Sequence, residues 1–194
     1  MTRLTFFTMI FVVASFAAVA KGSDDQQRSP RKVVEDFWNM EIDGGRLTPQ
    51  GWNRAEQFFV RPTPMPMKKV ISVVYKGSVI SDPIVHGTRA EVTVDIQPQG
   101  RINSELLFIP SESYKSGLLV RLTLTDKHRE QDSHSRLGKE TIGAPEWRIE
   151  GAGNMLWISV DTAIRYVTEM RAKTSNPLIK KNADRTLAKL KSLH

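Results

Sequence analysis

Hydrophobic and polar positions divide the chain into a helical start, a middle of alternating strands and a helical end. After Ser29-Pro30, an N-cap followed by proline at the first helical position, apolar residues recur at helical spacing. The positions of this face are Val33, Val34, Phe37, Trp38 and Glu41. Because Asp43-Gly44-Gly45 cannot extend a helix, the pattern predicts one helix between Pro30 and Asp43.

A second helix start lies at Thr48-Pro49. Its apolar positions are Trp52, Ala55, Phe58 and Phe59. The proline-rich segment 61–66 ends it, because each proline removes a backbone donor and restricts the residue before it. The two helices are therefore expected to form a hairpin.

The middle of the chain has the period of two that is typical of half-buried strands. The segments that alternate are 90–97, 118–125 and, briefly, 147–150. Segments 70–75 and 79–80 are rich in β-branched residues, and 104–109 is predicted as a further strand. Alternation places one face of a sheet on a core and the other toward solvent, as antiparallel sheets commonly do. We expect four to six antiparallel strands, and an α+β fold in which the N-terminal helices pack on a strongly curved sheet.

Helical period returns after Gly151-Ala152-Gly153, which we interpret as a turn. One helix is predicted from Ser159 onward, with Val160, Ala163, Ile164, Val167 and Met170 on one face. Asn176-Pro177 begins a last helix, whose apolar side would hold Leu178, Ile179, Ala183, Leu187 and Leu190. Residues 158–194 are expected to be a C-terminal helical appendage. The polar segment 126–145 is longer than most structureless loops.

The N-terminal 20 residues have the organisation of a secretory signal peptide. Arg3 precedes an apolar run, and Ala18-Val19-Ala20 offers the small residues that signal peptidase accepts. The expected organisation is a signal peptide over 1–20, a disordered linker over 21–28, and an α+β domain over 29–157 before the appendage. The mature protein would be periplasmic in a bacterium, or extracellular.

Composition narrows the partners. The chain has no cysteine, so an exported fold must hold without disulfides. The net charge of +7 is concentrated at the end, since residues 162–194 carry eight Lys/Arg against two Asp/Glu. An exported basic tail suits anionic lipid, polysaccharide or an acidic protein, and we expect no nucleic acid partner. The candidate residues for this anionic surface are Lys180, Lys181, Arg185, Lys189 and Lys191.

Four segments together resemble exported members of the nuclear-transport-factor-like superfamily, which includes SnoaL-like and ketosteroid-isomerase-like proteins. They are the Ser-Pro-x-x-Val-Val-x-x-Phe helix at 29–37, the Gly-Gly-x-Leu-Thr-Pro-x-Gly-Trp-x-x-Ala-x-x-Phe-Phe hairpin at 44–59, the alternating strand at 90–97 and Pro-Glu-Trp-Arg-Ile at 145–149. The resemblance covers about residues 29–150. It implies a cone of helices against a bent sheet, enclosing an apolar pocket.

Large apolar and aromatic side chains are the candidates for lining such a pocket. At their helical and strand spacing they are first of all core residues, and any that face a hollow cone would suit an apolar ligand. The candidates are Phe37, Trp38, Trp52, Phe58, Phe59, Tyr75 and Trp147.

No catalytic residue, metal site or cofactor is predicted. His128 and His134 match no closed zinc spacing and lie among basic residues, so we interpret their segment as a solvated loop. His86 is expected at a strand end or turn, and Asp95 on the outward face of its strand. Tyr75, Tyr114 and Tyr166 have no acidic partner by spacing.

The sequence therefore predicts an exported, non-enzymatic domain that binds a small apolar ligand or a protein partner. Its basic C-terminal helix would hold it near the envelope, through peripheral contact with an anionic membrane, and a homodimer could form through the sheet face. The alternative is a SnoaL-like isomerase, cyclase or hydrolase with an unrecognised acid or base in the pocket.

Overall fold

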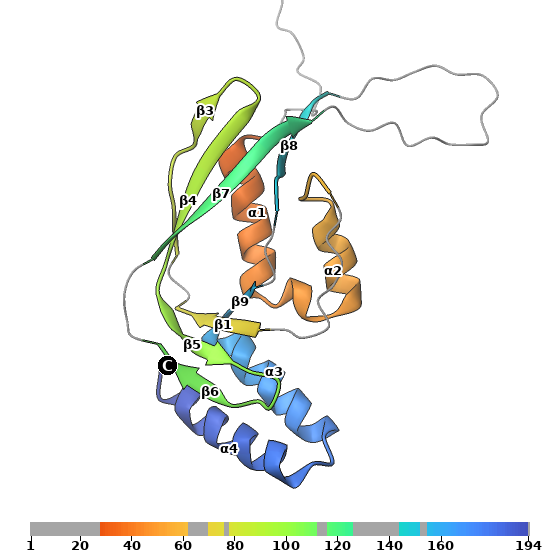
Figure 1. Ribbon diagram of the computed structural model, residues 1–194, viewed down its shortest axis with the longest axis vertical. Helices are drawn as coiled ribbons and strands as arrows, with labels where there is room; N and C mark the ends of the chain where they lie inside the picture. The colour runs from red at the N-terminus through yellow and green to blue at the C-terminus, as the bar shows by residue number, and fades with distance from the viewer. Residues whose placement is uncertain are drawn as a thin grey trace, which may run out of the picture.

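The computed structural model describes residues 28–61, 70–75, 78–111, 116–125, 144–151 and 155–193. Over these residues the protein is α+β, as expected (Figure 1). The helices are α1 (Pro30–Ile42), the 3-10 helix η1 (Gly45–Leu47), α2 (Pro49–Glu56), α3 (Val160–Lys173) and α4 (Pro177–Lys191). The strands are β1 (Val70–Val74), β2 (Val79–Ile80), β3 (Ile84–His86), β4 (Arg89–Ile96), β5 (Pro98–Ile102), β6 (Phe108–Pro110), β7 (Ser116–Thr125), β8 (Glu146–Ile149) and β9 (Met155–Ser159).

The strands form two sheets, and consecutive strands of the chain connect one sheet to the other. The first has the order β2-β4-β7-β8, with β3 also pairing β4, and the second has the order β6-β5-β1-β9. Only Gln97 separates β4 from β5, so the chain passes directly from one sheet into the other (Figure 1). The result is a strongly curled, mainly antiparallel half-barrel.

Each sheet has its own helical cover and its own core. Helix α1 lies against the inner face of the first sheet, where alternate residues of β4 are buried, and α3 and α4 lie at the other end against the second sheet (Figure 1). The first cluster includes Val34, Val92 and Leu122, and the second includes Ile102 and Leu190. Since α4 contributes to the second cluster, it belongs to the folded body.

The predicted helix starts are confirmed by their capping bonds. Side-chain oxygens of Ser29, Thr48, Ser159 and Asn176 accept backbone N–H groups of the helices that follow them. Helix α2 is shorter than predicted. It ends at Glu56, where the chain turns. Phe59 then forms a parallel bridge with Ile149 and so belongs to the edge of the first sheet.

The predicted strand set is too small, and one pairing differs in direction. Strand β9 pairs parallel with β1, placing Leu156 beside Ile71 and Ile158 beside Val73. Its sequence, Met-Leu-Trp-Ile-Ser, shows no simple alternation of apolar and polar residues, because helices cover both of its faces. Strands β3 and β5 were also missed, and both are short segments next to β4.

The last helix is held by polar as well as apolar contacts. The Thr186 hydroxyl donates to the Leu106 carbonyl at 2.7 Å and accepts the Phe108 N–H at 2.9 Å, and Asn182 Nδ2 donates to the Glu105 carbonyl at 3.2 Å. These bonds fix α4 on the turn between β5 and β6. The signal peptide, nearly all of the predicted linker and residues 126–143 lie outside the described residues.

One residue of α4 departs from its predicted side. Leu178 was expected among the apolar positions but is 60% exposed, whereas Leu190 is fully buried. At about 100° per residue, Leu178 falls outside the arc that faces the sheet and α3, which is centred near Ile179 and Ala183.

Candidate functional site

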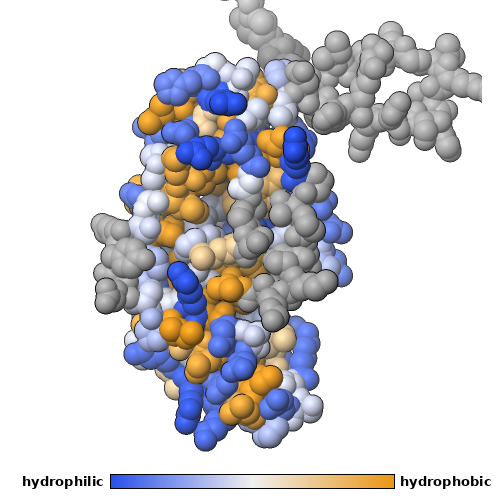
Figure 2. Space-filling view, in the orientation of Figure 1, coloured by the Kyte–Doolittle hydropathy of each residue, from blue (hydrophilic) through white to orange (hydrophobic). Residues whose placement is uncertain are grey.

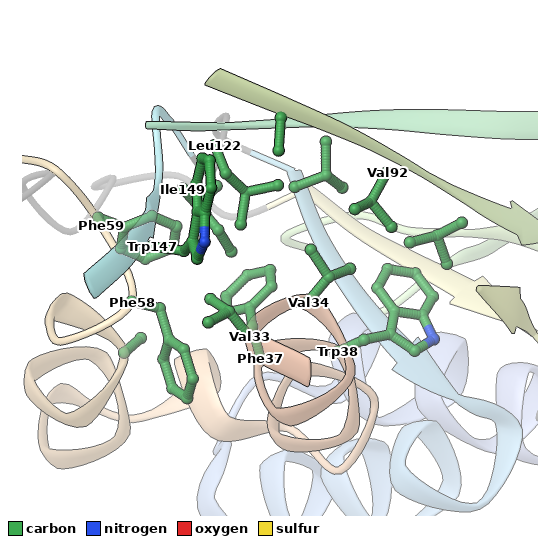
Figure 3. Packing of buried hydrophobic residues seen from close by; sticks show 14 of the residues in the cluster. Val33, Val34, Phe37, Trp38, Phe58, Phe59, Val92, Leu122, Trp147 and Ile149 are labelled. Atoms are coloured by element: carbon green, nitrogen blue, oxygen red, sulfur yellow. The ribbon is translucent and has the colours of Figure 1, made fainter. Parts of the chain in front are cut away.

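Six of the seven predicted pocket residues lie in the protein interior. Phe37, Trp38, Trp52, Phe58, Phe59 and Trp147 are buried, whereas Tyr75 is 53% exposed. The Phe37 ring contacts Phe58 and Phe59, with ring centroids 5.8 and 5.2 Å apart. Figure 3 shows the side chains from α1 meeting Trp147, Ile149 and Leu122 of the sheet. The aromatics of the first cluster therefore pack on one another and on the sheet, whereas Trp52 belongs to the second cluster.

A surface depression adjoins this cluster between α1 and α2. Its volume is about 520 Å³, and it is open to solvent. The residues lining it are Met40, Asp43, Gly44, Gly45, Thr48, Arg54, Gln57 and Phe58. Phe58 is thus the one predicted pocket residue among them, and the lining also includes the polar residues Asp43, Thr48, Arg54 and Gln57.

The most unusual buried chemistry is an ion pair that joins α1 to η1. Arg46 Nε donates to Glu41 Oε2 at 2.7 Å and Arg46 Nη2 to Oε1 at 2.6 Å, and both side chains are 1% exposed. The guanidinium also lies over two rings, 5.5 Å from the centroid of Phe37 and 5.1 Å from that of Trp52. A planar guanidinium suits both the paired carboxylate and the aromatic faces.

The same pair completes the outer edge of β9. Trp157 N–H donates to Glu41 Oε1 at 3.0 Å, and Arg46 Nη2 donates to the Met155 carbonyl at 2.9 Å. Residues 155 and 157 present their backbone groups to the same edge of the strand. Glu41 and Arg46 therefore take the place of a neighbouring strand, which would otherwise have to supply these bonds.

Glycine residues make this arrangement possible. Gly44 has φ +89°, so the chain leaves α1 in the left-handed region and reverses within a few residues to bring Arg46 back to Glu41. A Cβ on Gly51 would lie 1.5 Å from the Gly45 carbonyl oxygen, so α2 can approach this turn only at glycine.

The sequence analysis missed this ion pair. Glu41 stood on the apolar side of its predicted helix, and an acidic residue there is itself a sign of a buried partner. Arg46 follows Glu41 by five residues, but this spacing does not match a known motif. The pairing depends on β9, whose position the local pattern did not show.

Both oxygens of the Glu41 carboxylate accept hydrogen bonds from Arg46 and Trp157, which is the geometry of a structural group.

The other polar residues considered in the sequence lie outside this ion pair. His86 is at the end of β3 and Asp95 is exposed, as predicted. Burial raises the pKa of the Tyr166 phenol, and the nearby Glu169 charge adds to the effect. His128, His134 and Tyr114 lie outside the described residues.

The predicted basic surface is present on α4. All five candidate cations are exposed, on the side of the helix that faces away from the second sheet. In the described parts of the chain, the ion pairs nearby join Arg171 to Asp184 and Lys173 to Glu169. The only acidic residue within α4 thus already has a partner on α3.

The outer face of the first sheet is partly apolar. Leu119 pairs across from Thr93, one residue out of phase with the core residues Leu118 and Val94, and is 46% exposed. Val79 and Ile84, 66% and 59% exposed, pair with β4 at its other edge and lie on the same outer face of the sheet as Leu119.

Neither a family model, nor a curated protein sequence, nor a solved structure matches this chain. Among the described helices, none is long and apolar enough to cross a bilayer. Over the same residues, no three or more His, Asp or Glu side chains gather where they could hold a metal ion.

Proposed function

We propose that this protein is an exported binding domain that attaches to an anionic surface of the cell envelope through the outer face of α4. The observation that carries the proposal is the exposure of five cations on one helix whose only acidic residue is already paired. Cations in this arrangement keep their charge available for a partner outside the protein.

The packing of α4 supports an electrostatic mode of attachment. Ala183, Thr186 and Leu190 are buried against the second sheet and α3, so the apolar side of the helix is already used within the fold. An interfacial helix that inserts in a bilayer instead buries its apolar face in lipid. Attachment that depends mainly on charge is reversible and weakens with salt, because ions screen it.

Replacing the five cations with glutamine is expected to abolish binding to anionic vesicles. Near an anionic membrane each basic residue contributes about 1 kcal/mol, so we expect a loss of at least about 100-fold in the partition coefficient. Co-sedimentation with vesicles containing phosphatidylglycerol, at about 50 mM salt, measures it. The set is Lys180, Lys181, Arg185, Lys189 and Lys191.

A matched control removes the same number of charges elsewhere. Five arginines outside α4 are also exposed, and their replacement with glutamine gives the same net charge. They are Arg54, Arg61, Arg89, Arg101 and Arg121. The control should bind nearly as the parent does. Equal binding by the α4 variant and the parent would refute the proposal.

The curled sheet with helices on its inner face supports membership of the nuclear-transport-factor-like superfamily and its cone-shaped fold, which we include in the proposal. The function is proposed to be non-enzymatic, and the mutual packing of the aromatics favours a protein partner over a small apolar ligand. A second copy, docked through Val79, Ile84 and Leu119, is one such partner. Light scattering of the purified protein measures the oligomeric state.

Export is a proposal that rests on the sequence. Expressed with its leader in a bacterial host, the protein should accumulate as a chain that begins near Lys21, because signal peptidase accepts Ala18-x-Ala20. Intact-mass measurement of the periplasmic fraction tests this. A full-length chain in the membrane fraction would contradict it.

A further inference from the structure

Leu178 is an exposed apolar residue at the beginning of the basic helix. It is 60% exposed, whereas other apolar residues of the same helix are buried. The two residues that flank it in the sequence are Pro177, also exposed, and Ile179, which is half-buried and packs against the second cluster. Leu178 therefore points away from the core at the end of the molecule.

Leu178 shares one row of the helix with three of the five cations. Lys181, Arg185 and Lys189 follow it at spacings of three, four and four residues, which keeps all four side chains on one face. At 1.5 Å per residue the row is about 16 Å long. Figure 2 shows hydrophobic atoms among hydrophilic ones at this lower end of the molecule.

The neighbours of α4 leave this row open. Asp184, on the side toward α3, is held by Arg171, while Asn182 and Thr186 face the turn between β5 and β6. The row lies between these two contacts, on the side turned to solvent. The turn between β5 and β6 also carries Glu105, whose backbone carbonyl accepts from Asn182 and whose residue is exposed.

We propose that the anionic surface is a phospholipid bilayer, and that Leu178 enters its headgroup region while Lys181, Arg185 and Lys189 contact lipid phosphates. This inference rests on the proposed function and names its partner. The cations alone would suit any polyanion. An exposed leucine within their row gains free energy only where the partner offers an apolar layer beneath its charges, as a bilayer does and a sulfated polysaccharide does not.

The experiment uses the absence of native cysteine, which allows a single probe to be placed anywhere. Leu178→Cys carries an environment-sensitive nitrobenzoxadiazole label, and Thr88→Cys, exposed at the tip between β3 and β4, is the matched control. With phosphatidylglycerol vesicles, emission from position 178 should shift to the blue and that from position 88 should not. Dextran sulfate should shift neither.

Binding is measured on the unlabelled protein in parallel. Leu178→Ser is expected to lower the vesicle partition coefficient about fivefold and to leave dextran sulfate binding unchanged, since it removes apolar area without changing charge. Unchanged emission at position 178 on vesicles that do sediment the protein would overturn the insertion of Leu178 while leaving electrostatic attachment intact. Full vesicle binding by the five-glutamine variant would instead overturn the proposed function itself.

Discussion

Glu41→Gln is expected to lower the free energy of unfolding by about 3–5 kcal/mol, the cost of leaving a buried charge without its counterion. The Arg46 guanidinium is 1% exposed, so it would keep its charge in the interior after losing the carboxylate that pairs with it. Urea denaturation followed by tryptophan fluorescence measures the loss. The control is Asp36→Asn on the same helix, which removes partly exposed pairs with Lys32 and Arg28 and should change stability little.

A double variant separates the pair from its effect on the sheet edge. Replacing a buried ion pair with apolar residues often costs little. Here Glu41→Leu with Arg46→Met would also leave the Trp157 N–H and the Met155 carbonyl without these partners, at about 1–3 kcal/mol for each group. We therefore expect the double variant to remain clearly less stable than the parent. Stability equal to that of the parent would show that the edge of β9 does not need this pair.

Leu190→Ala is expected to cost about 2–5 kcal/mol, because it creates a cavity between α4 and the second sheet. Leu190 is fully buried in the cluster that includes Ile102, Phe108 and Leu156. The measurement is the change in unfolding midpoint in urea at constant slope. The effect would show that the last helix stabilises the body of the protein.

The chain offers a matched control for this prediction in the same helix. Leu178→Ala removes the same atoms from a side chain that is 60% exposed, so stability should change by less than about 0.5 kcal/mol. Equal effects at the two leucines would contradict the packing of α4 described above. Together the pair of variants separates the contribution of α4 to folding from its proposed contribution to binding.

Features that depend on neighbouring residues were predictable from the sequence. The starts of α1, α2, α3 and α4 follow from a capping side chain and, for three of them, a proline beside it. The alternation in β4 was equally informative, since every second residue from Ala90 to Ile96 is buried. The basic face of α4 could also be predicted, because lysine and arginine side chains are rarely buried unless they are paired.

Features that join distant parts of the chain needed the tertiary structure. Strand β9 pairs with β1 across more than eighty residues, and its coverage on both faces removes the alternation by which a strand is recognised. Glu41 and Arg46 are close in sequence, but their role at the edge of β9 appears only once that strand is placed.

The candidate site divides in the same way. Sequence spacing could identify Phe37, Phe58 and Phe59 as large apolar side chains, but whether they line a hollow or fill it depends on how closely the helices approach the sheet. The helical pattern placed Leu178 with the buried leucines, because spacing at 3.6 residues per turn does not by itself show where the buried arc of the helix ends. Its exposure is set by the direction from which the sheet and α3 meet α4, and local sequence does not encode that direction.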